Sequence, residues 1–218
     1  LNPALFNKIK SVYENQANFK LNDEQKYFLE NLYKSFVRNG ANLNSRDQDT
    51  LKMLNQRLAV LTVKFEQNVL EEINNYKLYV DKKGLTGLPE SLIEPAAAVA
   101  KAAGQEGKYA FTTQKPSVFP FITYSPDRDL RREIFNAYNM RGNNGNEYDN
   151  NKILAEIVKL RAARAKLLGY KTHADIVLEP RMAKTPESVF NLLNSLWEKA
   201  IPVAKNEVSM MQKIIDSE

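Results

Sequence analysis

The side chains that could carry acid–base or metal chemistry are few in this sequence. Its 218 residues contain one histidine, His173, and no cysteine. A catalytic zinc site takes three protein ligands, normally with at least one or two histidines, and a carboxylate-bridged di-iron bundle needs two Glu-x-x-His units. One histidine is too few for these metal sites, but it is compatible with a Ser–His–Asp catalytic triad. Because no Gly-x-Ser-x-Gly motif occurs and His173 directly follows the helix-capping Thr172, we interpret His173 as a capping or packing residue.

Other motifs also have simpler structural interpretations. The glycine-containing strings GNNGN and GLTG match neither the dinucleotide-binding nor the phosphate-loop pattern, so they predict turns. The loop from Asn143 to Asn151 is rich in amides and carboxylates, but it lacks the residue order of an EF-hand, and we interpret it as a loop that caps the next helix. Trp197 is interpreted as a core residue. We therefore assign no catalytic, cofactor-binding or metal-ligating residue in this chain.

The charge pattern bears on possible partners. Lys and Arg number 31 against 26 Asp and Glu, but the two signs alternate along the sequence. The densest basic stretches, 127–133 and 159–166, are interpreted as helix surface, with Asp127 and Arg131 paired at i,i+4. We expect no nucleic-acid partner, since such binding concentrates charge on one face. No signal peptide or membrane span is recognisable, and we expect no membrane partner. The compartment is left open between cytoplasm and periplasm.

The elements that would position these residues are predicted to be long helices. The sequence has 8 glycines and 9 prolines, fewer than average usage would give, so turns are scarce. Apolar residues recur at helical spacing, and Ser45 with Gln48 resembles a capping box. The predicted helices are 23–39, 45–74, 90–103, 126–141 with Ser125 as its N-cap, 150–168, 172–178 and 186 onward, the last with a kink near Pro202. Residues 76–80 and 108–113 have β-rich composition. The predicted class is all-α with at most one small two-stranded ribbon.

Several strings, in the same order along the chain, resemble the thimet oligopeptidase family of zinc metallopeptidases, and within it most closely the bacterial peptidyl-dipeptidases. They lie in the family's non-catalytic region, upstream of its zinc motif. The strings are LNPALFNKIKSVYE at 1–14, FVRNGANL at 36–43, LAVLTVKFEQN at 58–68, GLPESL at 87–92, RGNNGNEYDNNKI at 141–153 and LLGYKTHADIVLEPRMAKTPE at 167–187. None is a catalytic signature, so the specificity comes from their number and order.

The resemblance implies a function for a larger protein. Family members are mostly helical, two-lobed enzymes whose zinc is held by a His-Glu-x-x-His helix and a later Glu, and no position here matches that motif. Residues 1–218 are thus expected to be a single helical segment, truncated at both ends, that lines the channel of a peptidase releasing C-terminal dipeptides from oligopeptides. Zinc is expected in the parent enzyme and not in this chain, which should be inactive alone. Its partners would be the oligopeptide substrate and the remaining segments of its own chain.

Two alternatives stay open. The chain could be a free-standing helical protein-binding module without catalysis, or a basic nucleic-acid binder. A segment cut from a larger body should also expose apolar faces and self-associate, and we expect the N-terminal helix with Leu5, Phe6 and Ile9 to take part.

Overall fold

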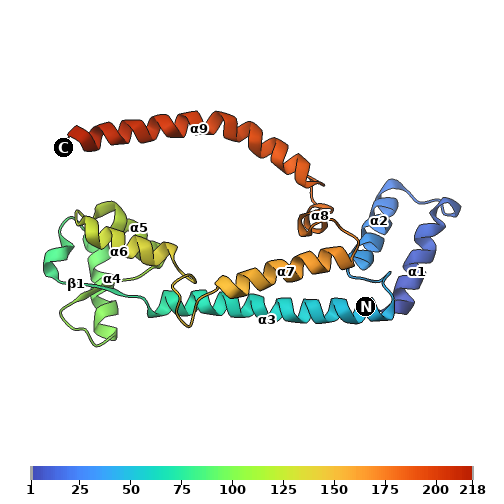
Figure 1. Cartoon of the computed structure of the whole chain (residues 1–218), viewed down its shortest axis with the longest axis horizontal. Helices are drawn as coiled ribbons and strands as arrows, with labels where there is room; N and C mark the ends of the chain where they lie inside the picture. Colours follow the sequence, from blue (N-terminus) through green and yellow to red (C-terminus); the bar gives the residue numbers. More distant parts are fainter. Residues whose placement is uncertain (1, 218) are drawn as a thin grey trace. The chain divides into compact units, whose positions relative to one another are not determined.

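The computed structural model describes residues 2–217, and within them helices dominate (Figure 1). The helices are α1 (Pro3–Glu14), α2 (Asp23–Arg38), α3 (Ser45–Asn75), α4 (Glu90–Ala102), α5 (Lys115–Tyr124), α6 (Arg128–Asn139), α7 (Asn151–Leu167), α8 (His173–Leu178) and α9 (Pro186–Ser217), with short 3-10 turns at Gln16–Asn18 and Lys82–Leu85. Strands β1 (Leu78–Val80) and β2 (Tyr109–Phe111) pair antiparallel, Leu78 opposite Phe111. The predicted all-α class with a two-stranded ribbon is confirmed.

Helix starts follow the capping rules, but two predicted caps are wrong. The α3 cap is Asn44, whose side chain accepts from the amide of Asp47 at 2.9 Å, so the predicted Ser45 box is displaced by one residue. The α6 cap is Asp127, which accepts from the amides of the next turn, and not Ser125. In both helices the residue directly before the first helical position supplies the capping oxygen.

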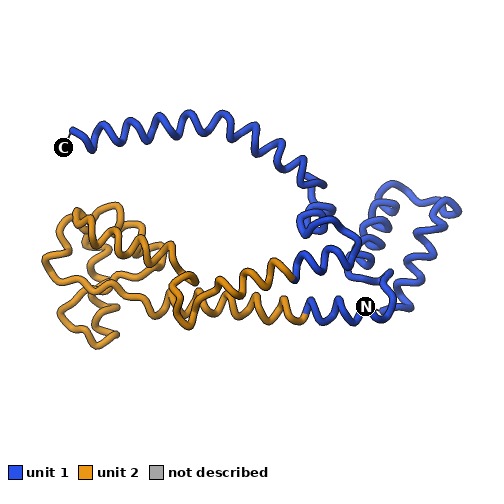
Figure 2. The backbone as a smooth tube through the Cα atoms, viewed as in Figure 1, with its two compact units in different colours: residues 1–55, 160–218 blue, residues 56–159 orange. Residues whose placement is uncertain are grey.

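The chain divides into two compact units, residues 1–55 with 160–218 and residues 56–159, with both boundaries inside helices (Figure 2). In unit 2, α4 packs against β2 and α5 against α6. Its core is one apolar cluster consisting of Leu78, Val80, Leu88, Leu92, Ala96, Phe111, Val118, Phe121 and Ile134. Phe111 and Phe121 contact each other at 4.5 Å between ring centroids. Burial of this cluster holds the short ribbon, which three-residue strands could not do alone.

In unit 1, α1 and α2 form a helical hairpin joined by aromatic stacking. Phe6 stacks on Tyr33 and Phe36, and the rings of Tyr13 and Tyr33 are 4.0 Å apart. Phe6 and Ile9 are buried in this contact, so the expected self-association face on α1 is wrong for these two residues.

Leu5 of the same predicted face is exposed, as is Phe28 of α2, and much of the further exposed apolar surface of unit 1 lies on α9. This helix is continuous through Pro202 and has no buried residue. Trp197 is 66% exposed, so its predicted place in a core is wrong for this structure. None of the helices in residues 2–217 combines the length and the apolar character that crossing a bilayer requires.

Candidate functional site

His173 lies where the sequence predicted it, as the first residue of α8 behind the Thr172 cap. Its Nδ1 is buried without a hydrogen-bond partner. Burial lowers the pKa of His173, and the nearby guanidinium groups of Arg161 and Arg164 lower it further. Two neighbouring cations do not fit a zinc ligand. Among the described residues, no three His, Asp or Glu side chains lie close enough together to hold a metal ion.

We expect the chain to lose stability on mild acidification because of His173. Its native pKa lies below the ordinary value, so the unfolded chain binds the proton more readily. Stability due to the neutral ring is present above about pH 6.5 and is lost as pH falls through that value towards the native pKa. Urea unfolding between about pH 5 and 8 should therefore show a steeper decline for the native chain than for His173→Asn. Equal slopes would contradict the prediction.

A buried carboxylate near the end of α3 accepts hydrogen bonds on both of its oxygens. Glu72 Oε1 accepts from the side-chain amides of Asn144 at 2.9 Å and Asn146 at 2.8 Å, and Oε2 accepts from the amide of Gly142. Burial opposes ionisation, but the bonds from Asn144, Gly142 and Asn146 outweigh it and leave the pKa of Glu72 below its ordinary value. Glu72 is thus an anion near neutral pH, and its hydrogen bonds hold the loop after α6.

The same loop is closed by further contacts. Asn150 accepts from Asn68 Nδ2 at 2.9 Å and donates to the carbonyl of Phe65 at 3.1 Å. Gly142 has a φ of +75°, and a Cβ there would meet Asn150 Nδ2 at 2.9 Å, so glycine is required. Asp149 accepts from the backbone amides of Gly145 and Asn151. These acceptors face the loop's own donors, which agrees with the loop interpretation of 143–151.

A cavity of about 340 Å³ adjoins this network and is lined in part by Glu72, Tyr76, Arg141 and Tyr148. Burial, with the charge of Glu133, raises the pKa of Tyr76 to about 12. Arg141 lies over the Tyr138 ring, 4.0 Å from its centroid, and donates to its carbonyl. The two charged groups of the lining are thus bound within the fold, Glu72 by the loop and Arg141 by Tyr138, and we regard the Glu72 network as structural. The buried Tyr76 hydroxyl has no hydrogen-bond partner among the described residues.

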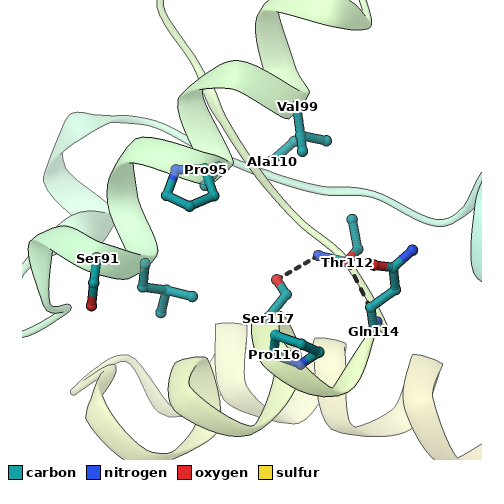
Figure 3. Close-up of a pocket in the computed structure, with 10 residues that line it drawn as sticks. Ser91, Pro95, Val99, Ala110, Thr112, Gln114, Pro116 and Ser117 are labelled. Carbon is teal, nitrogen blue, oxygen red and sulfur yellow. Dashed lines mark hydrogen bonds between the residues drawn. The ribbon is translucent and has the colours of Figure 1, made fainter.

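A second cavity in unit 2, of about 230 Å³, lies between α4, β2 and the start of α5 (Figure 3). Its apolar side is formed mainly by Leu92, Pro95 and Val99 of α4. Facing them, the amide of Thr112 donates to Ser117 Oγ at 2.9 Å. None of the ten lining residues is charged, so this cavity is suited to binding and lacks a group for proton transfer. Sequence reasoning missed it because α5 was not predicted.

Some arginines of the two basic stretches form hydrogen bonds or ion pairs with nearby groups of the same unit. Arg131 donates to the carbonyl of Ser125 at 2.6 Å, and the predicted Asp127–Arg131 pair is not among the ion pairs of residues 2–217. Arg132 pairs with Asp129 at 2.9 Å instead. In unit 1, Arg164 donates to the Asn55 side chain at 3.2 Å.

An ion pair connects α2 to the end of α8 in unit 1. Arg38 Nη1 lies 2.9 Å from Glu179 Oε2, which also accepts from the Tyr170 hydroxyl at 2.8 Å. Burial raises the pKa of Tyr170 to about 12, and the contact with Glu179 adds to the effect. No local sequence pattern marks this pair, whose charged members are 141 positions apart.

Comparison with known proteins connects this scaffold to a class of peptidases. Residues 121–218 match the family model described as peptidase family M3. Oligopeptidase A of Haemophilus influenzae is 35% identical over 89% of this chain, and that of Escherichia coli is 31% identical over 99%. The dipeptidyl carboxypeptidase of Escherichia coli is 30% identical over 100% of this chain.

The matches support the thimet oligopeptidase family, as the sequence resemblance implied. They do not single out the peptidyl-dipeptidases, because the oligopeptidases A match as strongly. The chain spans 29% of the length of the Haemophilus relative and 32% of the two Escherichia relatives.

Proposed function

We propose that this chain is a helical segment of a zinc-dependent M3 metallopeptidase that cleaves oligopeptides. The observation that carries the proposal is the similarity to such enzymes along 89–100% of the chain, in one continuous order. Zinc and its activated water would supply the chemistry, from residues outside this chain. The residues of this chain would shape and support the peptide channel, and release of C-terminal dipeptides is the finer form of the proposal.

The distribution of apolar surface supports a role inside a larger body. On α9, Leu193, Leu196 and Trp197 are each more than half exposed, and Val60 and Val63 of α3 are exposed as well. An isolated soluble domain rarely leaves a 32-residue helix with no buried side chain. A channel-wall segment would bury these faces against the rest of its enzyme.

The test begins with the reading frame beyond Glu218. We expect it to encode a His-Glu-x-x-His helix and a later Glu, and the extended protein to cleave oligopeptides in a chelator-sensitive way. The 218-residue chain should show no cleavage. Mass spectrometry of the products separates the two finer possibilities, since a peptidyl-dipeptidase yields C-terminal dipeptides and an oligopeptidase cuts at internal bonds.

Two results would overturn the proposal. A stop codon soon after Glu218, or a continuation without the zinc motif, would favour the free-standing binding module. Chelator-sensitive cleavage by the purified 218-residue chain would show that the chemistry does not need the missing motif.

A further inference from the structure

We propose that Asn144 is a deamidation site that its hydrogen-bonded loop protects, and that its conversion to aspartate releases the loop after α6 from Glu72. Asn144 is followed by Gly145, and an Asn-Gly pair is prone to this reaction because glycine leaves its own amide nitrogen sterically unhindered. The co-reactant is water. The inference concerns unit 2 alone and does not rest on the peptidase proposal, since it requires no enzyme.

The reaction uses the backbone of the loop itself. The amide nitrogen of Gly145 attacks Cγ of Asn144, and the bond from Cγ to Nδ2 breaks. The side-chain nitrogen leaves as ammonia, taking the proton of the Gly145 amide. One water then opens the resulting cyclic succinimide at either of its carbonyl carbons and restores that amide proton. The product at position 144 is aspartate or isoaspartate, with one water consumed and one ammonia released.

Both reacting groups are hydrogen-bonded in the closed loop. The amide of Gly145 donates to Asp149 Oδ2 at 2.9 Å, and Nδ2 of Asn144 donates to Glu72 Oε1 at 2.9 Å. The first bond must break before the amide can lose its proton, and the second before the side chain can turn toward the backbone. Deamidation of Asn144 therefore waits for the loop to open.

The open loop presents no steric obstacle. Asn144 and Gly145 are exposed, and the space beside the Gly145 Cα is empty, with φ at +66°. The sequence has a second Asn-Gly pair, Asn39–Gly40 in unit 1, where Gly40 is buried and a Cβ would collide with Leu51. Of the two pairs, the one in the loop is thus the more accessible to water and to the motion that the reaction requires.

The product changes the group that Glu72 faces. Nδ2 of Asn144 is a donor to Glu72 Oε1, whereas an aspartate at this position offers only acceptors and a negative charge. The hydrogen bonds that Glu72 accepts keep its pKa low, so the two carboxylates would both be ionised at neutral pH and would repel each other. An isoaspartate also adds a methylene group to the backbone. In either case the loop loses its contact with Glu72.

The first test measures the rate of deamidation by mass spectrometry. Trypsin cleaves after Arg141 and Lys152, so one peptide reports position 144, and the peptide 39–46 reports Asn39 as an internal reference. At mildly alkaline pH, Asn144 should react at least about tenfold more slowly in the native chain than in the chain unfolded in urea. Asp149→Ala frees the Gly145 amide and should raise the native rate at least about fivefold, with Asn39 unchanged.

Glu147→Ala is the matched control for Asp149→Ala. It removes the same charge from the same loop, but among the described residues Glu147 forms no hydrogen bond with Asn144 or Gly145, so the rate should not change. The protection is disproved if Asn144 reacts as fast in the native chain as in urea, or if the two variants behave alike. The site itself is disproved if Asn144 stays intact even in the unfolded chain.

The second test measures the effect of the new charge. Asn144→Asp should speed amide hydrogen exchange at Gly142, which donates to Glu72, at least about tenfold. Asn143→Asp adds the same charge one residue earlier and keeps the acceptor for Asn151, so exchange at Gly142 should not change. If Asn144→Asp left this exchange as slow as in the native chain, deamidation would not release the loop.

Discussion

Replacing Glu72 with alanine should lower the free energy of unfolding of unit 2 by about 2–3 kcal/mol. The substitution removes the acceptor for three donors at once, those of Gly142, Asn144 and Asn146. Asn144 and Asn146 are exposed and can turn to water, but Gly142 is buried. Its unpaired amide, together with the space left by the missing side chain, accounts for most of the loss. Urea unfolding followed by circular dichroism measures it.

The neighbouring Glu71 provides the control. Glu71 is exposed on the same helix, so Glu71→Ala should change stability by no more than about 0.5 kcal/mol. Glu72→Gln tests the role of the charge, because its amide would place a donor against the amide of Gly142. It should also destabilise the unit. If Glu72→Ala were as mild as Glu71→Ala, the loop would not depend on this carboxylate.

The pKa of Glu72 is lowered, as is that of His173, so both sites lose stability as the pH falls, Glu72 in the more acidic range. The native pKa of Glu72 is lowered, so its contribution is present above the ordinary value of about 4.3 and is lost as pH falls through the native pKa. The difference in stability between the native chain and Glu72→Ala should therefore shrink below about pH 4. A difference that stays constant into strong acid would contradict an ionised Glu72.

Most of the fold could be predicted because its signals are local. A capping side chain followed by a 3.6-residue apolar period lies within one helix, as for α2 after Asn22. Helix α5 was not predicted, because its local sequence does not favour a helix. It contains Pro116 and Pro120 and is rich in aromatic and β-branched residues, which favour strands or turns. Burial of Val118 and Phe121 in the unit 2 core overrides these local preferences.

The sites could not be predicted because their residues are far apart in the sequence. Glu72 and its partners are separated by 70–74 positions, and Asn68 and Asn150 by 82. No periodic pattern marks a carboxylate that will meet a distant asparagine loop. The β1–β2 ribbon depends on a pairing register, which three-residue strands do not encode locally. Trp197 shows the converse, since its apolar helix face is recognisable in the sequence but is exposed in the structure.

Replacing Phe111 with alanine should have the largest effect on stability, about 3–5 kcal/mol. Its ring is fully buried, contacts Phe121 and lies on the strand that α4 covers. The change removes apolar burial and leaves a cavity within the core cluster of unit 2. Phe135→Ala, at a site that is 52% exposed, is the control and should cost under about 1 kcal/mol.

The expected result is loss of slow amide exchange at Leu78, Val80 and Ile134 in Phe111→Ala and its retention in Phe135→Ala. Because unit 2 has one shared core, survival of slow exchange in β1 after Phe111→Ala would show that the ribbon is stabilised by something other than this cluster.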